Sequence, residues 1–273
     1  MLFFPALLLA LASASAASPS AAAGWRPLAR GADLRIIDAG KPSAVGDSRI
    51  TVVRFDPDHW RMEFAGISRT GDMSGRTARE WSKDRKFSAA INAGMYGTDY
   101  STHVGYLRFR EHVNSAGVNA YQSVAAFDPR RKELQPFRIF DLDAPGVTME
   151  AILKDYASAI QNLRLIKRPG SNRWSRQEKR WSEAALGEDD SGRILLIFCR
   201  SPFSMRELNE ELLAAGIGIV AAQHLEGGPE AQLYLHVGDL ELELFGSYET
   251  SFREDEGNTA PYPVPNVLGI RPR

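Results

Sequence analysis

The chain has 273 residues, of which 44% are hydrophobic and 25% are charged, a balance that is typical of a globular protein. Lys and Arg number 33 against 34 Asp and Glu, so the formal net charge is −1, which argues against a nucleic-acid-binding protein. Cys199 is the single cysteine, which excludes an internal disulfide, and its place in the apolar run 193–199 predicts a buried structural thiol.

The first 23 residues contain no charged side chain. Residues 2–11 are apolar apart from Pro5, and a Ser/Ala tract follows, which predicts a signal peptide over residues 1–23, cleaved for example after Ala14 or Ala16. The apolar run is shorter than the about 20 residues that cross a bilayer as a helix, so we expect no stable membrane anchor. An exported chain without disulfides fits a bacterial periplasm or the cell exterior. The alternative is a disordered Ala-rich tail that stays attached.

The segment that follows predicts strands and two short helices. Strand-like apolar content occurs over residues 32–37, 50–55, 61–67 and 121–127. Thr77 and Glu80 form a capping-box pattern, which predicts a short helix leading into a strand that ends at Asn92. Thr148 is expected to cap a second helix.

The C-terminal half is also rich in predicted strands. These cover residues 163–166, 194–198, 217–225, 232–237 and 240–244, and the last alternates strictly, as a strand with one buried face does. Ser204 and Glu207 form a second capping box, which opens a helix that Gly216 ends. Since no linker forces a division, residues 24–273 are expected to form one α/β (α+β mixed sheet) domain, strand-rich, with a mixed sheet flanked by a few helices.

Residues 225–230 read Leu-Glu-Gly-Gly-Pro-Glu and place two carboxylates, Glu226 and Glu230, at a turn between two strands. Gly227 and Gly228 permit positive φ and the close approach of a ligand, and Pro229 fixes the exit of the turn. Acids at such a turn can be aimed at a substrate. The alternative is an ordinary polar hairpin.

Further short motifs accompany this turn in a fixed order: Ile91-Asn92-Ala93-Gly94-Met95-Tyr96, Gln161-Asn162-Leu163-Arg164, Glu183-Ala184-Ala185-Leu186-Gly187 and a closing segment, 263–270. From about Phe87 onward this order resembles the phosphodiester glycosidase family. The resemblance implies a mixed sheet flanked by helices and a carbohydrate or sugar-phosphate ligand. The family's Asp, Arg and Ser fall on Glu226, Glu183 and Glu230 here, so the implied pocket gains acids and loses a base.

Glu183 and Glu226 form the predicted catalytic pair, because glycosidic cleavage commonly uses two carboxylates that flank the bond. If the two approach each other, like-charge repulsion raises one pKa, which suits a general acid. Substrate-binding roles are predicted at this turn for Gly227, Gly228 and Glu230.

The other predicted substrate-binding residues come from earlier motifs. Asn92 and Gly94 are expected to position substrate, although a structural turn explains Asn92 equally well. Tyr96 is a candidate for stacking on a sugar or for packing. Asp99 and His103 are candidates for acid/base work or metal binding, or belong to a hydrogen-bonded surface loop.

Gln161 and Arg164 are predicted to bind substrate from a helix-to-strand region. Arg164 either holds a phosphate or carboxylate in place of the positive charge absent at Glu183, or pairs with Glu183 or Glu226.

Together these features predict an exported hydrolase of the phosphodiester glycosidase type that cleaves a glycosidic or sugar-1-phosphodiester linkage. The alternative is a non-catalytic periplasmic glycan-binding module on the same fold. We expect no cofactor and no nucleic-acid partner, although acids at the Glu226 turn can hold Ca²⁺ through oxygen ligands.

Overall fold

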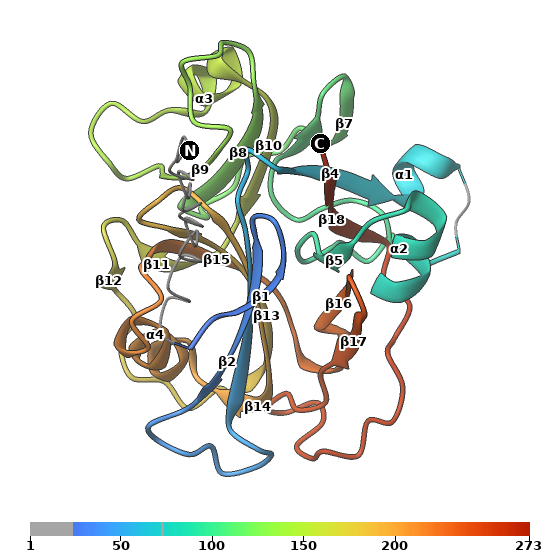
Figure 1. Cartoon of the computed structure of the whole chain (residues 1–273), viewed down its shortest axis with the longest axis vertical. Helices are drawn as coiled ribbons and strands as arrows, with labels where there is room; N and C mark the ends of the chain where they lie inside the picture. Colours follow the sequence, from blue (N-terminus) through green and yellow to red (C-terminus); the bar gives the residue numbers. More distant parts are fainter. Residues whose placement is uncertain (1–23, 72–73) are drawn as a thin grey trace, which may run out of the picture.

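A computed structural model describes residues 24–71 and 74–273, and the predicted signal peptide lies outside the described residues. The described chain is dominated by strands, which form three antiparallel sheets with a few short helices at the periphery (Figure 1). The prediction of a strand-rich α/β fold is therefore confirmed. No helix in the described part of the chain is long and apolar enough to cross a membrane.

The largest sheet has eight strands, and it carries the Glu226 turn. Its strands, in order across the sheet, are β1 (Arg26–Ala29), β2 (Ala32–Asp38), β3 (Arg49–Phe55), β14 (Ile194–Phe203), β13 (Trp181–Asp189), β15 (Ile219–Gly227), β11 (Arg164–Lys167) and β12 (Ser171–Asn172). Along β14, Leu195 and Ile197 pack into one hydrophobic cluster, while Leu196 and Phe198 pack into another. Burial of both faces explains why this strand is a continuous apolar run rather than an alternating one.

The two remaining sheets have five strands each. One consists of β7 (His112–Ser115), β6 (Leu107–Phe109), β10 (Tyr156–Asn162), β8 (Ser123–Pro129) and β9 (Phe137–Asp141). The other consists of β17 (Leu240–Phe245), β16 (Gln232–Val237), β5 (Ala89–Asn92), β18 (Asn266–Pro272) and β4 (Trp60–Gly66). Leu196, Ile160 and Ile91, one from each sheet, belong to the same buried cluster, so the three sheets share a core.

The helices α2 (Ala78–Arg85), α3 (Met149–Asp155) and α4 (Met205–Ala214) begin where the sequence predicts, whereas α1 (Ile67–Thr70) was not expected. The chain also forms the 3₁₀ turn η1 (Gly228–Glu230). Thr77 and Ser204 each form the predicted capping box, and Thr148 accepts a hydrogen bond from the N–H of Ala151. Helix α4 packs on the second face of the large sheet, where Leu208 and Leu212 are buried.

The segment that joins two of the sheets differs from the prediction. Gln161 and Asn162 are the last residues of β10, and Arg164 opens β11, so the chain passes from one sheet into another with only Leu163 between them. The expected helix ends earlier, at Asp155. The next strand, β12, pairs back onto β11.

Candidate functional site

Glu226 lies at the end of β15, where the strand gives way to the turn η1. Its side chain is only 8% exposed. The N–H of Gly227 donates to one carboxylate oxygen at 3.2 Å, and no other group in residues 24–71 and 74–273 donates to this carboxylate. Burial raises the pKa of Glu226 to about 8, and the negative charges of Glu230 and Glu249 add to the increase, while His224 opposes it. At neutral pH this carboxyl group is therefore mostly protonated and able to give up a proton.

Glu183 lies on the neighbouring strand and is held in an ion pair. One of its oxygens is 2.6 Å from His224 Nδ1, and the other accepts a hydrogen bond from the indole N–H of Trp181 at 2.7 Å. Burial disfavours a charged imidazole, but the charge of Glu183 and its hydrogen bond outweigh that effect, so the pKa of His224 is raised. The imidazole of His224 therefore holds its proton more firmly than a free histidine does, and it interacts electrostatically with both Glu183 and Glu226.

The pairing of β13 with β15 brings these groups together. Ala185 pairs with His224 and Ala184 pairs with Glu226, with a shift in register between them, and Glu183 then pairs with Gly227. The two predicted catalytic carboxylates thus lie on adjacent strands next to one turn. His224 was not among the predicted site residues. Its spacing of two residues before Glu226 on one strand is the signal that points to it.

The two glycines of the turn allow close packing by protein side chains. A Cβ on Gly227 would lie 2.7 Å from Cδ1 of Trp181. Gly228 has φ +65°, and a Cβ there would lie 2.6 Å from Oε2 of Glu249. The glycines therefore bring Trp181 and Glu249 against the Glu226 turn.

Asn92 fixes the shape of the turn. Its amide donates to the carbonyl oxygen of Glu230 at 2.9 Å, and its oxygen accepts from the N–H of Gln232 at 2.7 Å. Tyr96 lies close by, and burial together with the charges of Glu230 and Glu226 raises the pKa of its phenol. Asn92 and Tyr96 thus gather at the Glu226 turn, Asn92 as a support and Tyr96 as a protonated neighbour of the acids.

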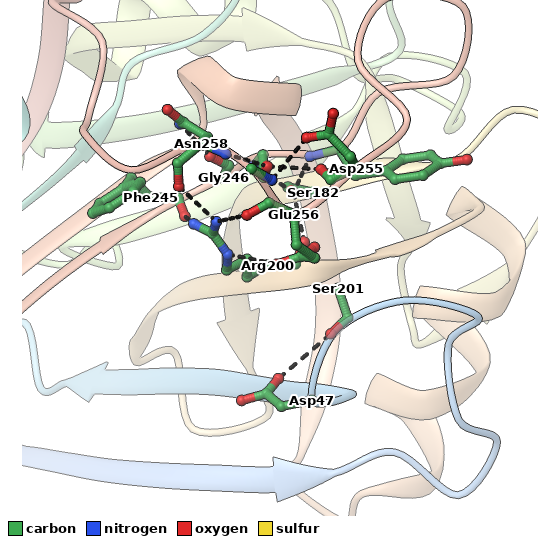
Figure 2. A network of polar contacts seen from close by, with 12 residues as sticks. Asp47, Ser182, Arg200, Ser201, Phe245, Gly246, Asp255, Glu256 and Asn258 are labelled. Carbon is green, nitrogen blue, oxygen red and sulfur yellow. Dashed lines mark hydrogen bonds and ion pairs between the residues drawn. The ribbon is translucent and has the colours of Figure 1, made fainter.

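The loop that carries Glu249 is tied to the large sheet by the network that Figure 2 shows. The hydroxyl of Ser182 donates to the carbonyl oxygen of Arg200 and accepts from backbone N–H groups of the loop. The guanidinium of Arg200 pairs with Glu256 at 2.6 Å and donates to the carbonyl oxygen of Asn258 at 2.9 Å. This anchoring holds Glu249 beside the turn, where burial and the charge of Glu230 raise the pKa of its carboxyl.

Asp99 and His103 do not form a pair. Asp99 is exposed and accepts hydrogen bonds from Ser101 and Thr102 within its own loop. His103 is buried, its Nε2 is 2.8 Å from the carbonyl oxygen of Gln161, and burial lowers its pKa to about 4. The expected joint acid/base or metal-binding role therefore has no geometric basis in this loop.

Gly94 and Gln161 pack tightly into the fold. Gly94 has φ +149°, and a Cβ there would collide with Asn162 and His103. The side chain of Gln161 is fully buried, accepts from the N–H groups of Tyr106 and Asn119, and donates to two carbonyl oxygens of the loop 119–121. Gln161 thus holds this loop against the end of β10.

Arg164 does not pair with either predicted catalytic carboxylate. Its guanidinium lies 3.2 Å from Asp141 and 2.7 Å from Asp143. The expectation of an ion pair with Glu183 or Glu226 was wrong, because Arg164 pairs with Asp141 and Asp143 instead. His224 supplies the positive charge beside Glu183 instead.

No group of three or more His, Cys, Asp or Glu side chains in residues 24–71 and 74–273 is arranged to hold a metal ion. Calcium binding at Glu226 and Glu230 therefore stays a prediction that rests on the sequence. Cys199 is buried, and burial raises the pKa of its thiol, as expected for a structural cysteine.

The three-sheet fold with an acidic turn at the end of β15 defines a strand-rich α/β domain of the kind found in phosphodiester glycosidases. A family model described as phosphodiester glycosidase matches residues 85–271. The chain therefore belongs to the phosphodiester glycosidase family, as its motifs predicted. No curated protein matches the sequence.

Two solved structures share the fold. The catalytic domain of zebrafish N-acetylglucosamine-1-phosphodiester alpha-N-acetylglucosaminidase, auto-inhibited by its pro-peptide, aligns with a TM-score of 0.62 and 14% identity, over 91% of this chain and 85% of that one. A hypothetical protein from Synechocystis aligns with a TM-score of 0.53 and 16% identity, over 89% of this chain and 62% of that one. At these identities the likeness extends to the fold alone.

Proposed function

We propose that this chain is a hydrolase that cleaves a glycosidic bond in a glycan, with Glu226 as the general acid. The observation that carries the proposal is a buried carboxyl group with a pKa of about 8 beside an ion pair. Membership of the phosphodiester glycosidase family and the activity named for the zebrafish protein support a carbohydrate or sugar-phosphate substrate.

In the proposed reaction, Glu226 transfers its proton to the oxygen of the leaving group as the glycosidic C–O bond breaks. A water molecule adds to the anomeric carbon and loses a proton, which restores the protonated state of Glu226. As Glu226 becomes negative, the positive charge of His224 stabilises it. Both oxygens of Glu183 already accept hydrogen bonds, so Glu183 acts through His224, as a positioning residue that keeps the imidazole charged and oriented.

The charge around Glu226 favours a glycosidic linkage over a phosphodiester. Glu230 and Glu249 both interact electrostatically with Glu226, and no Arg or Lys side chain in the described residues forms a salt bridge with any of these three glutamates. A phosphate at this position would meet negative charge without the Arg or Lys partners that usually bind it.

We also propose that the chain is exported to a bacterial periplasm or to the cell exterior. The uncharged, partly apolar first 23 residues support this location, together with the presence of a single, buried cysteine.

The test is a release assay on exopolysaccharide fragments and aryl glycosides with the Glu226→Gln variant. We expect turnover to fall by about 10²- to 10⁴-fold, because a positioned acid contributes a factor of that size. Glu178→Gln, an exposed glutamate without a salt bridge or hydrogen bond in the described residues, is the matched control and should retain wild-type turnover. Wild-type activity in the Glu226→Gln variant would contradict the assignment.

The second candidate is glycan binding without cleavage, which the replacement of the family's Arg, Asp and Ser by Glu183, Glu226 and Glu230 favours. Isothermal titration with polysaccharide fragments, run beside the release assay, separates the two functions. Binding with no product after long incubation would select the binding module.

A further inference from the structure

A cavity of about 240 Å³ lies where the chain passes from β10 into β11. Its walls include Tyr121, Gln122, Leu163, Arg164, Arg173 and Trp174. The cavity is open to solvent on one side and has room for one small polar ring. Two aromatic side chains and a few polar groups are the usual composition of a small-molecule site.

The aromatic wall formed by Trp174 is fixed in place. Its indole N–H donates to the carbonyl oxygen of Arg164 at 2.9 Å, and its backbone N–H donates to the side chain of Asn172 at 3.1 Å. The ring is only partly buried, on the margin of the second hydrophobic cluster. One polar atom of the indole is therefore satisfied, and part of its apolar face remains uncovered.

The second aromatic residue of the lining, Tyr121, is held through its backbone. Its N–H donates to the side chain of Asn119 at 2.9 Å, and its carbonyl oxygen accepts from the side-chain amide of Gln161 at 2.7 Å. Because Gln161 is fully buried, this wall is anchored to the end of β10. The indole of Trp174 and the backbone of Tyr121 are thus held in place before any ligand binds, which lowers the entropic cost of binding.

The ionic groups of this cavity leave one positive charge without a partner. Arg164 pairs with Asp141 and Asp143, and Lys167 also pairs with Asp143 at 2.8 Å. Arg173 is exposed and has no ion pair or hydrogen bond from its side chain within the described residues. Of the two arginines in the lining, Arg164 is paired with aspartates, so Arg173 is the one left to attract a ligand with a single negative charge. The planar fork of a guanidinium matches a carboxylate in a bidentate manner.

The cavity adjoins the candidate active site. The carbonyl oxygen of Leu163, in its wall, accepts the backbone N–H of His224 at 2.8 Å. The two places differ in charge, because three glutamates gather at the Glu226 turn while a free arginine lines the cavity. An acidic group on a glycan is thus repelled at one place and attracted at the other.

We propose that this cavity binds a sugar ring that carries one carboxylate, packed against Trp174 and Tyr121 and paired with Arg173. The site goes beyond the proposed hydrolase, because binding here needs none of the glutamates at the Glu226 turn. A phosphate monoester, which is close to doubly charged at neutral pH, would need a second free cation. Arg164 is already neutralised by its two aspartates.

The test uses the full chain and three probes: glucuronate, glucose and glucose 6-phosphate. Binding is measured by isothermal titration and by chemical-shift changes of the tryptophan indole N–H groups. Wild-type protein should bind glucuronate at least tenfold more tightly than glucose or glucose 6-phosphate. Arg173→Ala should weaken glucuronate binding by roughly 10- to 100-fold, the loss typical of a charge-assisted hydrogen bond.

Matched variants separate this site from the fold and from the active site. Arg26→Ala removes another exposed arginine without a side-chain partner in the described residues and should leave binding unchanged. Trp174→Phe keeps a ring and should bind, whereas Trp174→Ala should not. Glu226→Gln should bind glucuronate like wild type, so a failure of the hydrolase proposal leaves this result intact.

Three results would overturn the proposal. These are no binding of any probe, equal binding by the Arg173→Ala variant and wild type, and tighter binding of glucose 6-phosphate than of glucuronate. The last result would assign the cavity to a phosphate instead.

Discussion

Strand β13 carries a buried glutamate near each end, and the two differ in their partners. Glu188 is 2% exposed, forms an ion pair with Arg168 and accepts the backbone N–H of Ile139. Glu183, at the other end, is also 2% exposed, but it faces His224 and lies beside the unpaired Glu226. Arginine is permanently charged and makes the first end a static support, whereas histidine and a protonated glutamate can exchange protons. Burial alone therefore does not distinguish a structural acid from a catalytic one.

The comparison predicts opposite effects on stability at the two ends. Arg168→Ala leaves Glu188 with one fewer positive partner inside the protein, which should destabilise the fold by about 3 to 5 kcal/mol. The measurement is urea denaturation followed by fluorescence. Arg176→Ala, an exposed arginine without a partner in the described residues, serves as control and should change stability by less than about 0.5 kcal/mol. If Arg168→Ala is as stable as that control, the static role assigned to Glu188 is wrong.

Glu226→Gln should stabilise the protein at alkaline pH. The folded-state pKa of Glu226 is about 8, above the ordinary value of 4.5, so the folded state holds a proton that the unfolded state loses between these values. Wild-type stability should therefore fall as pH rises from 4.5 to 8, and the variant should lack this loss, which amounts to about 5 kcal/mol at pH 9. Urea midpoints measured from pH 5 to 9 test this. Parallel curves for the two proteins would show that Glu226 has an ordinary pKa.

The rate should depend on pH at the same place. A general acid works only while it is protonated, so turnover should fall tenfold per pH unit above about pH 8. A pH profile of kcat/KM checks where this fall begins, because kcat/KM reports the pKa values of the free protein. A rate that continues to rise above pH 9 would assign Glu226 to another role.

Asn92→Ala should have a moderate effect on both stability and activity. It removes two hydrogen bonds that hold the Glu226 turn, at Glu230 and Gln232, which should cost about 1 to 3 kcal/mol of stability. Turnover should fall, but the pH above which the rate declines should change little, because Glu226 itself remains. Thermal unfolding and the release assay measure the two effects, and a shift of that pH would point to direct contact with the reacting atoms.

Asp99→Asn should have the smallest effect. Asp99 is exposed and bonds only within its own loop, so stability should change by less than about 0.5 kcal/mol and turnover should stay within twofold of wild type. A loss of turnover comparable to that of Asn92→Ala would show that Asp99 contributes to the site.

Local sequence was sufficient for the capped helices and for the acidic turn. The capping boxes at Thr77 and Ser204 depend on groups three residues apart, and both form. The Gly-Gly-Pro turn placed Glu226 at a strand end for the same local reason.

Contacts between distant segments were beyond the reach of local patterns. The register of β13 against β15 brings Glu183 to His224, which are 41 positions apart, and a histidine within an apolar strand looks like a core residue. Arg164 was assigned to the wrong partners because Asp141 and Asp143 carry no local sign of their contact with it. Long-range pairing, rather than residue type, thus decided which predicted side chains met.

The passage of β10 into β11 through Leu163 has a mechanical consequence. One nearly continuous run of backbone belongs to two sheets, so those sheets cannot slide past each other without breaking ladder hydrogen bonds on both sides. The surface that these two sheets present to a ligand is therefore rigid. Any conformational change must come from segments outside the ladders, such as the stretch from Gly246 to Asn258, which Arg200 holds through hydrogen bonds.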